Sequence, residues 1–359
     1  MSTSVSDNGL LEETLTRLFS EHSDAASRQV AESSGWMPGC WEAMAESGLI
    51  WIGVPEAVGG LGGDLDDVCT LIRLAGRHAV PLPLAECTLI GGWLAALAGL
   101  QLPNGPLTVA IPRSDDALRI EGNRVRGRLS RVPWANQAAA VVAVADGPSG
   151  PRVVLIDPTQ VTVAAGHNLA GEPRDSLHLD GITLENGQIG IPPSDPSAEL
   201  LLRGGLSRTL LMAGAMETIT TLTIDYASQR HQFGRAIASF QAVAQRLVQM
   251  SAESEMAVLA GEVAARRFAD VGVDATFEVA AANATVSRAA SEVAAHAHQV
   301  HAAIGMTQEY PLHHFTRRLW AWRQEWGSER YWSEVLGQQV VICGADGLWA
   351  NVTTGLEED

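Results

Sequence analysis

The sequence of 359 residues contains no lysine, so every strongly basic side chain is an arginine. Acidic residues outnumber basic ones by 41 to 24, which gives a formal net charge of −17 at pH 7. Proteins that bind nucleic acid need a positive surface to neutralise phosphates. The composition therefore argues against a nucleic-acid partner, although a few arginines can still hold a small anionic ligand.

Cysteine is scarce: the sequence has four, at Cys40, Cys69, Cys87 and Cys343, and none forms a Cys-x-x-Cys pair. The usual zinc and dithiol redox motifs are therefore absent. Cys69 and Cys87 lie in apolar runs, which predicts buried thiols. Unpaired, buried cysteines are typical of a reducing compartment, and we expect a cytoplasmic protein.

Long hydrophobic runs are missing as well. No stretch reaches the roughly 18 apolar residues of a membrane-spanning helix. Residues 1–8 are polar, whereas a secretory signal has an apolar core. We therefore expect neither a membrane span nor a signal peptide. With 46% hydrophobic and 18% charged residues, the chain has the composition of a globular protein of two or three compact units.

The spacing of apolar residues divides the chain into three parts. Residues 1–103 show helical periodicity, residues 104–196 show short apolar runs between turn residues, and residues 197–359 are helical again. This order predicts an α+β protein with an N-terminal helical domain, a small middle β domain and a C-terminal helical domain. The expected strands lie near residues 107–111, 125–129, 138–144 and 153–156.

Several helix ends can be predicted from single residues. Pro38 stands where proline suits the first turn of a helix, and that helix should stop at Gly48. Asp64 is a candidate N-cap for the next helix. A further helix is expected over residues 84–97. In the last part, an alanine-rich helix over 277–298 presents one small apolar stripe, formed by Val279, Ala282, Val286 and Ala290, which is typical of close helix packing.

The segment 226–250 reads as a helix that is interrupted and then resumes. Arg230 and Gln232 precede Phe233 and Gly234, and glycine allows a tight backbone turn. An arginine beside an aromatic side chain at a helix break suits an anionic, planar ligand. The residues alone leave a second interpretation open, in which the segment is an ordinary corner between two helices.

This segment closely resembles the acyl-CoA dehydrogenase signature, Y-A-x-x-R-x-Q-F-G-x-x-I-x-x-F-Q. Two other segments are similar to the family in order and spacing. Residues 41–63 end in VPEAVGGLGG, and residues 299–317 read QVHAAIGMTQEYPLHHFTR. The resemblance covers essentially the whole chain and is weakest in the middle part.

The resemblance implies a fold and an activity. The family has an N-terminal helical domain, a middle β-barrel or sandwich domain and a C-terminal four-helix bundle, usually assembled as a tetramer. Its members use FAD for the α,β-dehydrogenation of an acyl-CoA thioester, in fatty acid or steroid catabolism. The electrons usually pass to an electron-transfer flavoprotein.

The resemblance also implies a cofactor site shared between protomers. Arg230 would reach the FAD pyrophosphate of a neighbouring protomer, and the adenosine side would be framed by nearby amides and an aromatic ring. The residues implied to bind the cofactor are Arg230, Gln232, Phe233, Gln241, Gln299, Ala303 and Gly327.

The sequence departs from the family at the flavin-facing positions. Ala302 and Ala303 replace a Gly-Gly pair. Near residue 133 the family has a hydroxyl residue beside the flavin, whereas Pro133 offers neither a hydroxyl nor an N–H. In the segment at the start of the β domain, only Pro112 and the pair Ser114-Asp115 match the family pattern.

The catalytic base is also displaced. Most members carry a glutamate immediately before the Gly-Thr or Gly-Ser pair, where this sequence has Trp326. Glu325 is one residue early, about 100° away on a helix, and is the candidate base. The position that some other members use falls near Gly204, which has no carboxylate, and Glu217 lies further along the same helix.

Three interpretations remain open. The chain is an active acyl-CoA dehydrogenase, a subunit that completes the FAD site of a heteromeric α2β2 enzyme, or a member of the fold with other chemistry, such as flavin-dependent oxygenation or a scaffold role. We predict no metal site, because His313-His314 lacks accompanying carboxylate or cysteine spacing.

Overall fold

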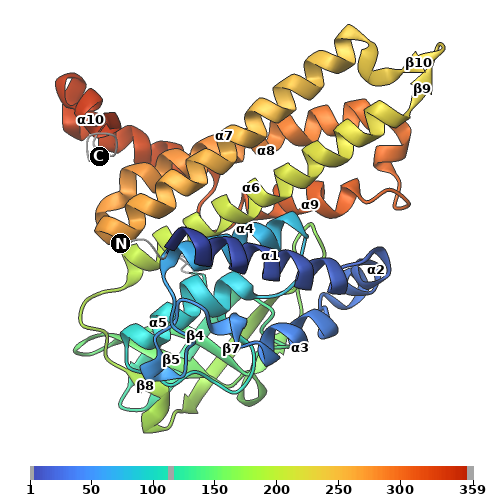
Figure 1. Ribbon diagram of the computed structural model, residues 1–359. Coiled ribbons are helices and arrows are strands. Elements are labelled where there is room, and N and C mark those ends of the chain that lie inside the picture. Colours follow the sequence, from blue (N-terminus) through green and yellow to red (C-terminus); the bar gives the residue numbers. More distant parts are fainter. Residues whose placement is uncertain (1–3, 112–116, 354–359) are drawn as a thin grey trace. The chain divides into compact units, whose positions relative to one another are not determined.

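The computed structural model describes residues 4–111 and 117–353. Its contacts divide the chain into two compact units, Met1–Ser207 and Arg208–Asp359 (Figure 1). The boundary falls inside the long helix α6 (Ser197–Gln229). The finer division into three domains at residues 103/104 and 196/197 remains a prediction.

The first unit begins with helices whose ends follow the predicted signals. Pro38 lies in the first turn of α3, and Gly48 adopts a left-handed φ of 73° just beyond its end. Asp64 caps α4 through a reciprocal capping box with Asp67. The helix predicted over 84–97 begins instead as a π-helical turn, Glu86–Ile90, before α5. The helices are α1 (Ser4–His22), α2 (Ala25–Ser34), α3 (Pro38–Glu46), α4 (Leu65–Arg77) and α5 (Gly91–Leu97).

The rest of the first unit is a β-sheet with the strand order β6-β7-β3-β2-β4-β5-β8, in which β1 pairs in parallel with β4. Apolar side chains that alternate along the strands form its core, including Val125, Val141, Val154 and Leu177. The strands are β1 (Leu107–Val109), β2 (Leu118–Glu121), β3 (Arg124–Pro133), β4 (Ala140–Gly147), β5 (Gly150–Ile156), β6 (Thr162–Ala164), β7 (Arg174–Thr183) and β8 (Ile189–Gly190).

The second unit contains most of α6 and four further helices. The predicted small-residue stripe on α8 is buried, and at Gly261 of α7 an added Cβ would lie 3.3 Å from Leu210 Cδ2. The glycine thus lets α7 approach α6 closely, and the small residues of α8 allow similar close packing. The elements are β9 (His231–Gln232), β10 (Arg235–Ala236), α7 (Gln241–Val271), α8 (Thr276–His301), α9 (Leu312–Trp322) and α10 (Glu329–Thr353).

The second unit also exposes several large apolar side chains. Phe233 is 92% exposed, and on α10 Val341, Ile342 and Trp349 are 80%, 78% and 73% exposed. Helix α10 is interrupted at Gly344, whose φ of 69° and ψ of 174° are not helical. Within residues 4–111 and 117–353, no helix is both long and apolar enough to cross a membrane.

Candidate cofactor-binding hairpin and base position

A two-stranded hairpin connects α6 to α7 and projects beyond the ends of both helices (Figure 1). Its two-residue turn consists of Phe233, with a φ of 53°, and Gly234, with a φ of 80°. A turn with two positive φ angles matches the right-handed twist of paired strands. The backbone therefore holds a large aromatic side chain at the tip of the hairpin, in a conformation that phenylalanine rarely adopts.

The hairpin carries two exposed guanidinium groups and two aromatic rings. The Arg235 guanidinium lies 4.2 Å from the centroid of the Phe240 ring, and Phe233 meets the same ring edge-on at 6.2 Å. Arg230 is exposed, and its guanidinium has no partner among the described residues. Gln232 and Gln241 are exposed beside it. In a chain of net charge −17, this is a local cationic and aromatic surface.

The remaining predicted cofactor residues lie on other elements of the second unit. Gln299 is exposed on the last turn of α8, and Ala303 is exposed in the 3-10 turn η8 (Ala302–Met306). Ala302 has a φ of 55° and a ψ of −136°, a conformation suited to glycine. Gly327 has a φ of 97°, and an added Cβ there would lie 2.6 Å from Trp332 Nε1. Gly327 is thus required by local packing, whatever its relation to a cofactor.

Glu325 lies in the loop between α9 and α10 and is 3% exposed. Its Oε2 accepts a hydrogen bond from Arg208 Nε at 3.0 Å, and Arg208 is 2% exposed. The pair is therefore a buried ion pair, in which each charge compensates the other. A general base needs its carboxylate free to meet the substrate proton, and the Arg208 contact opposes this role for Glu325.

Trp326, at the position where the family carries its glutamate, is 1% exposed and has a φ of 55°. Its carbonyl accepts a hydrogen bond from Trp332 Nε1 at 3.1 Å, while its own indole N–H is buried without a partner. A positive φ is costly for a bulky residue. The surrounding fold therefore holds this tryptophan in place.

In the β unit, Pro133 ends β3, and its carbonyl accepts a hydrogen bond from Thr108 Oγ1 at 2.5 Å. This proline has no N–H and no hydroxyl, so it cannot donate a hydrogen bond to a flavin. Pro112, Ser114 and Asp115 lie outside the described residues.

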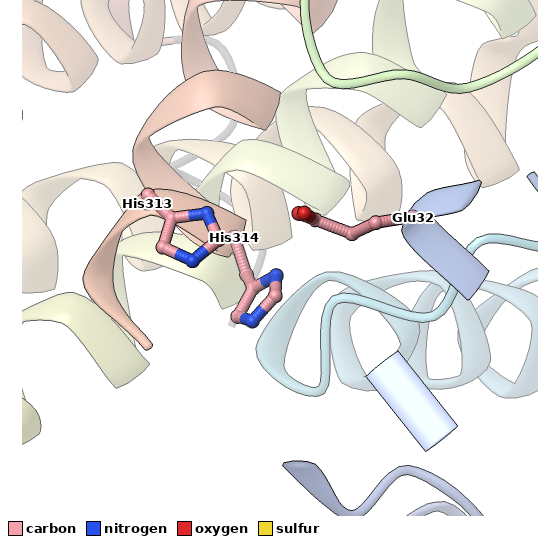
Figure 2. A group of neighbouring side chains, drawn as sticks. All are labelled: Glu32, His313 and His314. Carbon is pink, nitrogen blue, oxygen red and sulfur yellow. The ribbon is translucent and has the colours of Figure 1, made fainter. Parts of the chain in front are cut away.

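His313 and His314 are adjacent on α9, with ring centroids 4.0 Å apart (Figure 2). Glu32, which Figure 2 also labels, belongs to α2 of the first unit. Among the described residues, neither unit holds by itself three potential metal ligands grouped together. The absence of a metal remains a prediction.

Sequence reasoning missed Arg208 and Arg235. Arg208 is a single charge in the apolar run LSRTLL of α6, and a lone charge inside a helix core signals a buried partner. Arg235 directly follows the Phe233-Gly234 turn, so its place opposite Gln232 on the hairpin could have been derived from the strand pairing.

The comparisons with known proteins agree with this architecture. The family models "Acyl-CoA dehydrogenase, N-terminal domain" and "Acyl-CoA dehydrogenase, C-terminal domain" match residues 6–98 and 199–340. The acyl-CoA dehydrogenase IpdE2 of Mycobacterium tuberculosis is 30% identical over 325 residues, covering 86% of this chain and 89% of that protein. The acyl-CoA dehydrogenase FadE27 of the same organism is 28% identical, covering 77% and 80%.

A crystal structure of the ChsE4-ChsE5 complex from Mycobacterium tuberculosis superposes with a TM-score of 0.86 at 21% identity, covering 96% of this chain and 99% of that one. The chain belongs to the acyl-CoA dehydrogenase family, whose members are FAD-dependent oxidoreductases. The predicted fold, family and FAD cofactor are thereby confirmed.

The residues expected to bind FAD suit one part of the cofactor and not the other. The exposed Arg230 guanidinium suits a diphosphate, because its planar fork can donate two parallel hydrogen bonds. The exposed amides of Gln232, Gln241 and Gln299 suit ribose or adenine. At Pro133 the chain has no N–H and no hydroxyl with which to donate a hydrogen bond. The hairpin side thus fits the dinucleotide, whereas the β unit does not fit the flavin at this position.

Proposed function

We propose that this chain is a subunit of a heteromeric, FAD-dependent acyl-CoA dehydrogenase, in which its hairpin completes the FAD site of a partner subunit. FAD, when bound, would supply the hydride acceptor for the dehydrogenation of the acyl-CoA. The partner supplies the catalytic base and the flavin-facing β domain. This chain supplies Arg230 for the pyrophosphate, Gln232, Phe233 and Gln241 for the adenosine side, and the turn that carries Gln299 and Ala303.

The observation that carries the proposal is the contrast between the two halves of the cofactor site. The hairpin presents an exposed Arg230 whose guanidinium has no partner among the described residues, and a Phe233 that is 92% exposed. Together they offer a charge that suits a phosphate and an aromatic ring that suits a planar base. The hairpin that carries them projects beyond the ends of α6 and α7 (Figure 1), where a dinucleotide held by another subunit would contact both.

The base positions support the same conclusion. Glu325 is engaged by Arg208, and Trp326 fills the place of the usual glutamate. The alternative base position, Gly204, has no side chain, and Glu217 lies about three and a half helical turns beyond it on α6. None of these positions in the described chain therefore offers a carboxylate that is both suitably placed and free to remove an α-proton.

Two similar structures support a heteromeric assembly. The ChsE4-ChsE5 structure is that of a complex, and a second similar structure, the "Tcur3481-Tcur3483 steroid ACAD G363A variant", has a TM-score of 0.82 at 22% identity. By analogy, we propose a tetramer of this chain with another acyl-CoA dehydrogenase subunit. An acyl-CoA, with a steroid side-chain thioester as one candidate, is the substrate, and an electron-transfer flavoprotein is the electron acceptor.

The test is to count flavin in the chain purified alone and in complex with a partner encoded nearby. We expect little FAD in the chain alone and about one FAD for every two chains in the complex. In the complex, Arg230→Ala should lower FAD retention after gel filtration about tenfold or more, since a charge-assisted contact to phosphate is lost. Arg266→Ala, which removes an exposed arginine from α7, is the matched control.

Full flavin retention in the Arg230→Ala complex would remove Arg230 from the cofactor site. One FAD per chain in the isolated protein, with bleaching on addition of an acyl-CoA, would instead establish a self-sufficient dehydrogenase.

A further inference from the structure

Three aromatic rings meet where α6, α8 and the start of α9 come together. His301 stacks on Tyr226 with ring centroids 4.5 Å apart and planes inclined by 23°. Tyr310 lies 4.7 Å from His301 and meets Tyr226 edge-on at 5.9 Å. His301 is 1% exposed, so this ring is enclosed. The three side chains form a single contact, called here the ring stack.

The ring stack joins the two segments that carry the proposed cofactor residues. The Tyr226 carbonyl accepts the Arg230 N–H at 2.9 Å, so this ring sits on the turn from which the hairpin starts. His301 ends α8 two residues after Gln299 and directly before the turn that carries Ala303.

We propose that His301 is a positioning residue for FAD, whose ring fixes the hairpin and the end of α8 relative to each other so that Arg230 and Gln299 meet the same dinucleotide. The inference rests on the proposed function and adds to it the element that sets the geometry of the site.

The surroundings of His301 hold its ring in one orientation. Nδ1 lies 2.9 Å from the Ala297 carbonyl, so the proton is on Nδ1, while Nε2 is buried and has no hydrogen-bond partner among the described residues. Burial lowers the pKa of His301, which keeps the ring neutral. At Gly305 of η8 an added Cβ would lie 2.7 Å from His301 Cβ. The turn after α8 is thus packed directly against the histidine.

The outer ring of the stack is tied to α6 as well. The Tyr310 hydroxyl donates a hydrogen bond to the Leu222 carbonyl at 3.4 Å, one helical turn before Tyr226. A shift of α8 relative to α6 would therefore break the contact between His301 and Tyr226, and a shift of the segment before α9 would break the contacts of Tyr310. Packed aromatic contacts of this kind have few alternative arrangements, which suits a joint that must keep two ligand-binding segments in register.

The experiment uses the complex with its partner and measures two quantities, the FAD affinity by titration of the flavin-stripped complex and the melting temperature. The variants are His301→Ala, His301→Phe and Tyr310→Leu. Phe268→Ala, which removes a buried ring at the far end of α7, controls for general loss of packing. We expect His301→Ala to weaken FAD binding about tenfold and Tyr310→Leu about threefold.

His301→Phe keeps a ring in the stack and should restore the affinity to within about twofold of the wild type. Phe268→Ala should lower the melting temperature without changing the affinity. Wild-type affinity in His301→Ala, or equal losses of affinity in His301→Ala and Phe268→Ala, would overturn the positioning role. If Arg230→Ala weakens FAD binding but His301→Ala does not, only the positioning role of His301 fails. If neither Arg230→Ala nor His301→Ala weakens FAD binding, the proposed function fails as well.

Discussion

Trp326 and its neighbours are closely packed at the position where the family carries its glutamate. Glu325 and Arg208 are 117 positions apart in sequence and form a buried pair. Removing one partner of such a pair leaves an uncompensated buried charge. We predict that Glu325→Gln lowers the free energy of unfolding by about 3 kcal/mol and leaves turnover of the complex unchanged. Denaturant unfolding and steady-state kinetics with an acyl-CoA measure the two effects.

The double variant Arg208→Met with Glu325→Leu is the control, because it removes both charges and should recover much of the lost stability. The opposite pattern, with abolished turnover, bound flavin and unchanged stability in Glu325→Gln, would identify Glu325 as the base after all.

Ala302 illustrates strain at one residue. Its φ of 55° and ψ of −136° favour glycine, and the methyl group is exposed, so it contributes little packing. We predict that Ala302→Gly raises the free energy of unfolding by about 1 kcal/mol, since relief of strain exceeds the entropy gained by the unfolded chain. Ala303→Gly, at a position without a positive φ, should lower it. Equal effects of both changes would show that strain is not the cause.

Among the secondary-structure elements, the hairpin between α6 and α7 has a phenylalanine, Phe233, at a turn position whose positive φ this residue rarely adopts. Asparagine at the first turn position adopts a positive φ more readily than phenylalanine. We predict that Phe233→Asn increases hydrogen-exchange protection of the hairpin amides and lowers FAD retention by the complex about threefold. Phe233→Ala should lower retention without added protection. Undiminished retention in both variants would assign the exposed ring another role.

The sequence predicted those elements whose signals are local. Pro38 and Gly48 mark helix ends through their backbone preferences and Asp64 through its side-chain cap, and each acts as expected. Strands β2, β6, β7 and β8 were missed, although Leu177 and Leu179 alternate with polar residues in β7. Most of the other residues of this strand are charged, polar or histidine, so the sequence shows only two apolar residues in alternation. The two-residue period becomes clear only from which side chains are buried.

The candidate site likewise has one part that the sequence predicts and another that it does not. The hairpin lies within one continuous segment, and its turn could be predicted from Phe233-Gly234. The Arg208–Glu325 pair and the ring stack join residues that are far apart in the chain. Such contacts depend on how helices pack, which the spacing of residues along one helix does not determine.

For the whole molecule, pH affects stability through a histidine that is buried uncharged. Burial, together with Arg77 and Arg28, lowers the pKa of His78 to about 4. At pH values between this folded pKa and the unfolded pKa of about 6.5, the unfolded chain carries a proton on this histidine that the folded chain does not. Stability contributed by the neutral ring is therefore complete above pH 6.5 and is lost as the pH falls towards 4.

We predict that lowering the pH from 7 to 4.5 costs the wild type about 1–2 kcal/mol more than His78→Gln, after allowance for the partly exposed ring. Urea unfolding at the two pH values measures the difference. An identical pH dependence in both proteins would show that other groups titrate in this window.

The exposed side chains of α10 and the hairpin tip bear on how the protein is made. A newly synthesised copy without a partner presents Phe233, Val341, Ile342 and Trp349 to the cell, and such surfaces attract chaperones and proteases. We therefore expect unpaired copies to be short-lived, as a pulse-chase with and without the partner gene would show. Two genes whose products are stable only together must be expressed in balanced amounts, so the supply of the scarcer polypeptide sets the amount of enzyme that accumulates.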